Sequence, residues 1–571
     1  MSSYTYERAK AQAVETVQHA FGSAVALRAT PAPSIVAADL AVPCFPLAAG
    51  MRAAPDEIAQ QLAEALQLGG VLESVSAQGG YLNFTLNRAE YAASVMEDLT
   101  RLGDRYGSHT VGEGGKVVID YSSPNIARPM SVGHLRSTII GAALYRLAAF
   151  NGYRPIGINH PADWGTQFGA LLHAYTMWVD QDEYRRAPVR ELLRLYVKFA
   201  EEAERNPELR DHAREWSRKL EEGDPTARQL WQEFVQHSER EFARLYGLLE
   251  VTFDATLGES FYVDKTPEVI ALALERGVAR EDAGALIVPL ADAGIKTPLI
   301  LRRSDGGTLY PTRDLAAAIF RIRTYQPAQL LYVVGAEQRL YFRQLFATLQ
   351  KLGFTNVRCV HIDFGDVTLP AGRMSTRRGR VVFLEDVLSE AVTRARRLGD
   401  EKNPDLPEAE RERVAQQVGI GAVKYADLSQ SRVKNIAFDW DRMLSLEGDS
   451  APYLQYTYVR ALGILRKGAG EVLAGPFDPD AVASEEEWRL LMHLSQFPEA
   501  VAEAMAAYAP HVVANYLFVL AQAFHGFYHA APVLQAADSG LRRSRLQLVN
   551  AVAMVMRTGL GLLGIHAPER M

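Results

Sequence analysis

The fold is decided by the stretch Val117-Val-Ile-Asp-Tyr-Ser-Ser-Pro-Asn-Ile-Ala-Arg-Pro-Met-Ser-Val-Gly-His134-Leu-Arg-Ser-Thr138. Its β-branched start predicts a buried strand, its two prolines keep the next residues out of a helix, and helical spacing of apolar residues begins at Leu135. Ser131 is a suitable N-cap for that helix. Free N–H groups and the positive end of the helix dipole attract anions, so we expect Gly133 and His134 to lie beside a triphosphate.

Length and composition indicate several globular domains. The 571 residues exceed what one hydrophobic core organises, so we expect three or more domains. Residues 1–22 mix charges with apolar positions, which predicts an amphipathic helix and not a signal peptide. Polar residues interrupt the uncharged stretch 512–534, which favours a core helix over a membrane span. Cys44 and Cys359 lack metal or disulfide spacing, which fits a reducing compartment, and we expect a cytoplasmic protein.

Charge is distributed unevenly along the chain. A net charge of -7 argues against nonspecific coating of nucleic acid, which normally requires excess Lys and Arg. Basic residues nevertheless cluster at 373–380 and 542–545. Each cluster is either a solvated face or part of a shaped RNA site.

The order of the predicted elements indicates a split nucleotide-binding fold. Strands near Val117, Ile156 and 330–334 alternate with helices, which predicts a parallel sheet. A charged helical block at 180–246 and a hairpin at 297–310, turning at Asp305-Gly306, form an insertion. After about residue 385 strands vanish and helical spacing predicts a bundle.

Two further groups of residues favour chemistry on a nucleotide and a planar cation. The basic, glycine-flanked loop 372–380 offers guanidinium groups that could stabilise charge at a phosphorus centre. Tyr310 and Asp314 lie four residues apart on one predicted helix face, and guanidinium groups bind carboxylates and stack on rings. The alternatives are a capped helix with a buried histidine at His134 and an Asp314 that pairs with Arg313.

The chain resembles the arginyl-tRNA synthetases, a family of class I aminoacyl-tRNA synthetases. The resemblance extends over nearly the whole chain, because several segments follow in the family's order. These segments are Ser122–Thr138, which is similar to the HIGH region, Asp163–Gly169, Gly258–Tyr262, Tyr310–Asp314, Tyr332–Gln338, Phe438–Asp441, Ala451–Tyr456, Leu563–Ile565 and Arg570-Met571.

The resemblance implies an α/β Rossmann-type nucleotide-binding catalytic domain with insertions, flanked by an α/β N-terminal add-on domain and an all-α C-terminal anticodon-binding bundle. We expect four units: an add-on tRNA-binding domain over 1–107, the catalytic domain over 108–385 with its insertion at about 175–300, a helical stem-contact linker over 386–450, and the anticodon-binding domain over 451–571.

The resemblance also implies roles for individual residues. Arginine is expected to contact Asp120, Ser123, Asn125, His134, Tyr310, Asp314 and Gln338. ATP is expected to contact Gly133, His134, Met374 and Ser375, and catalytic support is expected from His134, Arg128, Ser131, Arg373, Ser375 and Arg377. The tRNA is expected to contact Tyr453, Tyr456 and Arg460, although helical spacing also allows these aromatic residues to be core. No resident metal site is expected.

Three positions depart from the family pattern. Ser131 replaces the first histidine of HIGH, Thr376 replaces the second lysine of KMSKS, and Asp120 replaces the usual Glu. Arg128 is the basic residue thought to supply the missing charge. The serine keeps a hydrogen-bond donor but not an imidazole, so slower use of ATP is expected.

The implied reaction is ATP-dependent formation of arginyl adenylate, with Mg²⁺ carried by ATP, and transfer of arginine to the terminal 2′-hydroxyl of tRNA(Arg). We expect a monomer without membrane association. Two alternatives remain: a non-catalytic paralogue that binds arginine and tRNA, and a tRNA-independent nucleotidyltransferase that uses the same split fold.

Overall fold

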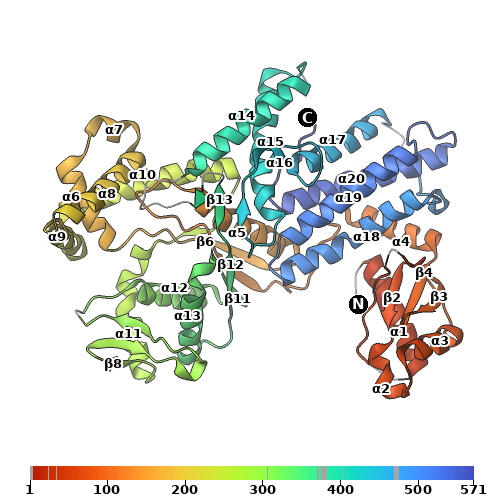
Figure 1. Ribbon diagram of the computed structural model, residues 1–571, viewed down its shortest axis with the longest axis horizontal. Coiled ribbons are helices and arrows are strands. Elements are labelled where there is room, and N and C mark those ends of the chain that lie inside the picture. The colour runs from red at the N-terminus through yellow and green to blue at the C-terminus, as the bar shows by residue number, and fades with distance from the viewer. Residues whose placement is uncertain are drawn as a thin grey trace.

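A five-stranded parallel sheet forms the centre of the chain in the computed structural model (Figure 1). The structure describes residues 4–22, 25–33, 35–304, 306–369, 372–373, 382–402, 404–468 and 475–571, with only the backbone at 368–369 and 372–373. The strand order is β12-β11-β5-β6-β7. The strands are β5 (Lys116–Asp120), β6 (Arg154–Asn159), β7 (Ala255–Thr256), β11 (Gln329–Gly335) and β12 (Arg358–Phe364).

Strand β5 is the switch point of the sheet: β6 and β7 lie on one side of it, and the later strands β11 and β12 lie on the other. It pairs with β6, the next strand in sequence, on one side and with β11 on the other. Asp120 at its carboxyl end lies opposite Tyr332 of β11 and Ile158 of β6. In open parallel sheets ligands bind in the crevice at such a switch point, so the fold places Asp120 at the expected position for a site.

Helix α5 (Val132–Phe150) follows β5 and covers the sheet, with Ser131 at its N-cap as the sequence predicted. Its close packing depends on Gly141, because a Cβ atom there would lie 2.2 Å from Cβ of Tyr121. A side chain at this position would therefore force the helix away from the loop that follows β5.

The segment between β6 and β11 is mainly helical, but it rejoins the central sheet once as strand β7. Five helices come first: α6 (Thr166–Trp178), α7 (Gln181–Arg186), α8 (Pro188–Arg205), α9 (Leu209–Glu222) and α10 (Pro225–Leu249). The chain then returns to the sheet as β7, within the range that the sequence assigned to an insertion at about 175–300. Helix α11 (Thr266–Glu275) and a small sheet of β8 (Arg280–Asp282), β9 (Ala285–Val288) and β10 (Leu299–Arg302) follow.

The predicted hairpin at 297–310 forms only in part, with a chain reversal between Arg303 and Gly307, and the expected turn residue Asp305 lies outside the described residues. Strand β10 pairs with the earlier strand β9, and only an isolated bridge between Arg302 and Thr308 links the two arms of the expected hairpin. The second arm instead leads into helix α12 (Tyr310–Tyr325), which has Pro311 in its first turn. Helix α13 (Arg339–Lys351) follows β11.

The N-terminal unit is a four-stranded antiparallel sheet with helices, drawn red to orange in Figure 1. Its elements are α1 (Thr5–Phe21), β1 (Thr30–Pro31), β2 (Leu40–Pro43), α2 (Ala48–Met51), α3 (Pro55–Ala65), β3 (Leu72–Gln78), β4 (Tyr81–Leu86) and α4 (Arg88–Leu102). It packs on α18 (Glu485–Ala506), where Tyr91 donates to Ser495 Oγ over 2.7 Å and Trp488 donates to Asp39 over 2.9 Å.

The C-terminal region is a helical bundle, as expected. It comprises α14 (Leu384–Lys402), α15 (Glu408–Leu428), α16 (Trp440–Met443), α17 (Ala451–Lys467), α18, α19 (His511–Ala530) and α20 (Ser539–Leu562). One expectation fails, because a short strand β15 (Ile436–Ala437) pairs with β13 (Val367–Leu369), which also pairs with β14 (Gly372–Arg373). In the described part of the chain, no helix combines the length and apolarity needed to cross a bilayer.

Candidate active site

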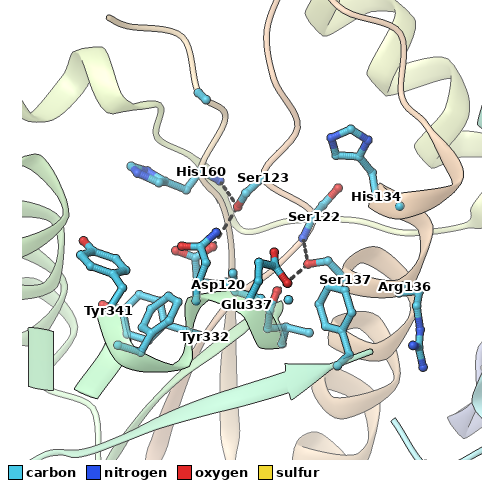
Figure 2. Close-up of a pocket in the computed structure, with 18 of the residues that line it drawn as sticks. Asp120, Ser122, Ser123, His134, Arg136, Ser137, His160, Tyr332, Glu337 and Tyr341 are labelled. Carbon is cyan, nitrogen blue, oxygen red and sulfur yellow. Dashed lines mark hydrogen bonds between the residues drawn. The ribbon is translucent and has the colours of Figure 1, made fainter. Parts of the chain in front are cut away.

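A cleft of about 990 Å³ lies at the carboxyl ends of the central strands (Figure 2). This volume is at the upper end of the roughly 300–1,000 Å³ usual for ligand sites. Residues from β5 and the loop after it, from the start of α5, and from α12 and β11 line it. Among the sequence-predicted residues, the cleft gathers Asp120, Ser123, Asn125, Ser131, Gly133, His134, Tyr310, Asp314 and Gln338.

The loop between β5 and α5 has an uncommon backbone conformation. Ser122, Ser123 and Ala127 have φ values of 72°, 47° and 62°, in the left-handed region that non-glycine residues rarely adopt. Specific hydrogen bonds hold this conformation: Ser122 N donates to Ser137 Oγ over 2.9 Å, and Ser123 N donates to Asn159 Oδ1 over 3.1 Å. Strain maintained by surrounding contacts is frequent in ligand sites, and here it fixes the edge of the cleft.

His134 is held by the N-cap of its own helix. The backbone N–H of Ser131 donates to His134 Nδ1 over 3.0 Å, which leaves Nε2 to carry the proton. Burial lowers the pKa of His134 to about 4, against a smaller opposing effect from the Ser131 hydrogen bond. At neutral pH the side chain is therefore an uncharged donor at the wall of the cleft, beside the free N–H groups of the helix start.

Asp120 is paired with a residue that the sequence reasoning missed. Arg321 Nη1 lies 2.6 Å from Asp120 Oδ2, and both side chains are buried. The other carboxylate oxygen accepts a hydrogen bond of 2.9 Å from Ser123 Oγ. Both oxygens of Asp120 are thus engaged within the protein, and this carboxylate orients Ser123. Arg321 follows Asp314 by seven residues, a helical spacing that could have revealed it.

Asp314 is the acidic group whose surroundings fit a cationic ligand. Tyr341 donates to Asp314 Oδ2 over 2.5 Å, and His160 Nε2 lies 3.6 Å from Asp314 Oδ1. The ring of Tyr310 meets that of Tyr341 edge to face with centroids 5.1 Å apart. Tyr310 is 51% exposed, so the phenol and the carboxylate share one open wall of the cleft.

The alternative pairing of Asp314 with its neighbour is excluded by geometry. Arg313 Nη2 lies 2.8 Å from Glu259 Oε2, and its Nε donates to the same oxygen over 2.9 Å. Arg313 therefore pairs with Glu259 and not with Asp314, and both carboxylates line the cleft.

Arg128 is a predicted site residue that the structure places outside this cleft. The Arg128 guanidinium lies 4.1 Å from the ring centroid of Tyr196 on α8 and lines a separate small hollow. Arg373 is described only as backbone in β14, and Met374, Ser375 and Arg377 lie outside the described residues.

The three residues expected to contact tRNA lie on α17, in the C-terminal bundle. Tyr453 packs within the bundle against Phe518 and His525. Tyr456 is 38% exposed, and the Arg460 guanidinium lies 5.8 Å from its ring centroid. Tyr456 is therefore exposed and Arg460 half-buried, whereas Tyr453 packs inside the bundle.

His160 and Tyr341 are further cleft residues that the sequence reasoning missed. His160 follows the carboxyl end of β6, a position where ligand-binding side chains gather, so its place after a predicted strand was a usable signal. Tyr341 comes from α13 and carried no local signal. In the described residues, no group of three or more His, Cys, Asp or Glu side chains is arranged to hold a metal ion.

Comparison with known proteins agrees with this arrangement. Residues 98–440 match the model for "tRNA synthetases class I (R), catalytic domain", 454–571 match "DALR anticodon binding domain", and 7–86 match "Arginyl tRNA synthetase N terminal domain".

Individual relatives match over nearly their full length. The arginine–tRNA ligase of Enterococcus faecalis is 46% identical over 93% of both chains, and that of Chloroflexus aurantiacus is 47% identical over 95% of both. The solved arginyl-tRNA synthetase of Thermus thermophilus is 28% identical, with a TM-score of 0.83 over 99% of this chain and 100% of that one.

Proposed function

The chain belongs to the arginyl-tRNA synthetase family, the ATP-dependent class I ligases that join arginine to tRNA, and from that premise we propose how its own residues carry out the reaction. The carboxylate of L-arginine attacks the α-phosphorus of ATP, which gives arginyl adenylate and pyrophosphate. The terminal 2′-hydroxyl of tRNA(Arg) then takes the arginyl group and AMP leaves. No side-chain nucleophile is needed, so the residues act by positioning and by stabilising charge.

Asp314 and Tyr310 bind the arginine side chain in this proposal. The observation that carries it is the carboxylate of Asp314, which lines the cleft and accepts a hydrogen bond from Tyr341 at Oδ2. A planar guanidinium can contact this carboxylate and stack on Tyr310, whereas the compact ammonium of lysine can satisfy only part of the site.

The α-amino and carboxylate groups of arginine contact Ser123, Asn125 and Gln338. All three line the cleft together with Asp314. We propose that Asp120 contributes indirectly, because its oxygens already accept from Arg321 and from the Ser123 hydroxyl.

ATP binds at the start of α5. The N–H groups near Gly133 and the protonated Nε2 of His134 supply donors for the phosphates, and Ser131 adds a hydroxyl in place of an imidazole. We further propose that Arg128, Arg373, Met374, Ser375 and Arg377 contribute to this site when ATP is bound. For Arg128 this requires release from the Tyr196 ring.

Mg²⁺ accompanies ATP in this proposal. The donor set of the cleft fits a cation that arrives on phosphate oxygens, since the carboxylates of Asp120 and Asp314 are engaged by Arg321 and Tyr341. Mg²⁺ would supply neutralisation of phosphate charge, and the protein's own donors would orient the α-phosphate.

The flanking units bind the tRNA. We propose that 1–107 contacts tRNA outside the acceptor end, that 386–450 contacts the stem beside the catalytic unit at 108–385, and that 451–571 binds the anticodon region. The exposed Tyr456 with Arg460 supports stacking of an unpaired base at α17, and Tyr453 supports the fold of that surface. We also propose a cytoplasmic monomer.

Aminoacylation with all amino acids in competition tests the proposal. We expect only arginine to be joined to tRNA, and we expect arginine-dependent exchange of pyrophosphate into ATP when tRNA is present. Binding of arginine and tRNA without any exchange would instead establish the non-catalytic paralogue. Exchange that does not involve tRNA would support the nucleotidyltransferase.

A further inference from the structure

His160 has one ring nitrogen bonded to the protein and one close to Asp314, the carboxylate proposed to bind the guanidinium. Its Nδ1 lies 2.7 Å from the carbonyl oxygen of Leu257, and since a carbonyl can only accept, Nδ1 carries a proton. Its Nε2 is buried, has no hydrogen-bond partner among the described residues, and lies 3.6 Å from Asp314 Oδ1. Figure 2 shows His160 and Tyr341 on one side of Asp120 and His134 on the other.

We propose that His160 is a proton-linked specificity residue: its imidazolium neutralises Asp314 before arginine binds, and Nε2 loses its proton to solvent when the guanidinium takes that place. The inference rests on the proposed role of Asp314 as the guanidinium-binding carboxylate. The balance is simple: one cation, arginine, enters the pocket and one proton leaves it. The bare Nε2 lone pair then accepts a guanidinium N–H, which adds a second acceptor beside Asp314.

The pairing of the other carboxylates near His160 supports this replacement of a proton by arginine. Of the other charged groups near the ring, Asp120 is paired with Arg321 and Glu259 with Arg313. Asp163 accepts from the N–H and hydroxyl of Ser260. The groups that interact with the ring from other elements are Tyr262, whose ring centroid lies 5.5 Å away, Arg321, Asp120, Asp163, Glu259 and Asp314.

Asp314 is thus the carboxylate that His160 can neutralise. Although desolvation alone disfavours the charged ring, the close approach of Asp314 and the charge of Asp120 outweigh it and raise the pKa of His160 above its usual 6.5. A second cation at Asp314 reverses this balance, because two cations facing one carboxylate repel each other in a partly desolvated pocket.

The preference for arginine over lysine follows from the shape of the cation that takes the place of the released proton. A guanidinium presents five N–H donors in a flat fork, so it can reach Asp314 Oδ1 and His160 Nε2 at once. The ammonium of lysine is a compact point charge and cannot lie in the same plane between the two acceptors. His160 therefore rejects lysine by leaving an unpaired buried group.

Calorimetric titration of L-arginine into the full chain tests the proposal. Titrations at pH 6.5 in two buffers of different ionisation enthalpy measure proton release. For the wild type we expect more than about half a proton released per arginine at pH 6.5 and almost none at pH 9, because a ring whose pKa exceeds 6.5 is mostly protonated at the lower pH. His160→Gln, whose side-chain amide does not titrate, is expected to bind arginine with almost no proton release at either pH. His237→Gln, on α10 outside the cleft, is the matched control and should behave as the wild type.

A second measurement needs no variant. As the pH rises toward the pKa of His160, the wild-type Kd for arginine should fall about tenfold per pH unit. Above that pKa the Kd should stay constant. A wild type that binds arginine without proton release, a Kd that does not change between pH 5.5 and 8, or a His160→Gln protein that releases protons as the wild type does would each overturn the inference. Absence of arginine binding by the wild type would instead overturn the proposed function.

Discussion

Arg136 and Asp427 form an ion pair in which each side chain is only 1% exposed, with Arg136 Nε 3.0 Å from Asp427 Oδ2. The same guanidinium donates to the carbonyl oxygens of Gly365 and Lys434 over 2.5 and 2.9 Å. One side chain thus joins α5, which carries His134, to the segment after β12 and to α15 of the helical region. The start of α5 is thus fixed by contacts from distant parts of the chain.

Replacing one member of this pair should destabilise the protein strongly. Asp427→Ala leaves the buried guanidinium without its counter-charge, and we expect a loss of about 3–5 kcal/mol in the free energy of unfolding. Urea titration followed by tryptophan fluorescence measures it. The control is Asp182→Ala, which removes an exposed pair with Arg185 and should cost less than about 0.5 kcal/mol. Equal stability of the two variants would contradict the assigned importance of burial.

Asp314→Ala should abolish arginine charging while the chain remains folded. Loss of a carboxylate that pairs with a desolvated guanidinium typically costs about 2–5 kcal/mol, or roughly 30- to 5,000-fold in kcat/KM. Steady-state aminoacylation measures this, with circular dichroism as the check on folding. The control is Asp264→Ala, an exposed carboxylate of the same region, which should leave the rate unchanged. Normal arginine affinity in Asp314→Ala would remove Asp314 from the binding site.

His134→Asn should slow adenylate formation without unfolding the helix start. The asparagine oxygen can replace Nδ1 as acceptor for the Ser131 N–H, but no donor replaces Nε2. Removal of one such donor typically lowers kcat by about 10²–10³-fold. Pyrophosphate exchange measures this step, with KM for arginine expected to change little. A variant that loses arginine affinity and keeps kcat would place His134 at the amino acid instead.

Gly141→Ala should destabilise the catalytic domain. The added methyl would lie 2.2 Å from Cβ of Tyr121, and neither the helix nor the buried ring can yield without strain, so we expect a loss of about 1–3 kcal/mol. Gly463→Ala is the matched control, because that helical position in α17 opens to free space. It should gain about 0.5–1 kcal/mol. Thermal unfolding of both variants should therefore shift in opposite directions.

Lys424 should make stability rise with pH above neutrality. Its Nζ donates to the carbonyl oxygens of Leu249, over 2.7 Å, and Gly564, and burial lowers its pKa from 10.5 to about 7. Between pH 7 and 10.5 the unfolded chain therefore binds a proton that the folded chain does not bind. The free energy of unfolding gains up to about 1.4 kcal/mol per pH unit in this window.

Lys424→Met tests this linkage. Urea titrations from pH 7 to 10 should give a flatter dependence for Lys424→Met than for the wild type. Lys402→Met, at an exposed position of α14, should keep the wild-type slope. Parallel slopes for all three proteins would show that Lys424 remains charged when buried.

The sequence predicted those elements whose evidence is local. The strand at 117, the N-cap at Ser131 and the helix from Tyr310 with Pro311 in its first turn all follow from neighbouring residues, and the structure contains them. The hairpin at 297–310 forms only as a single bridge between Arg302 and Thr308, because β10 pairs with β9, which no turn signal between 302 and 310 could indicate. The two-residue strand β15 forms only because β13 lies beside it.

The sequence by itself determined that this chain carries a capped helix start after a buried strand and a carboxylate with a phenol on one helix face, because both depend on spacing along a few residues. Only the tertiary structure decided the partners of those groups. Arg313 forms an ion pair with Glu259, and Arg321 forms one with Asp120. Asp314 instead lies beside His160 and accepts a hydrogen bond from Tyr341 at the cleft. The physical reason is that ion pairs and buried hydrogen bonds are selected by distance in space, and residues such as His160 and Asp314 meet only after the parallel sheet has brought the ends of its strands together.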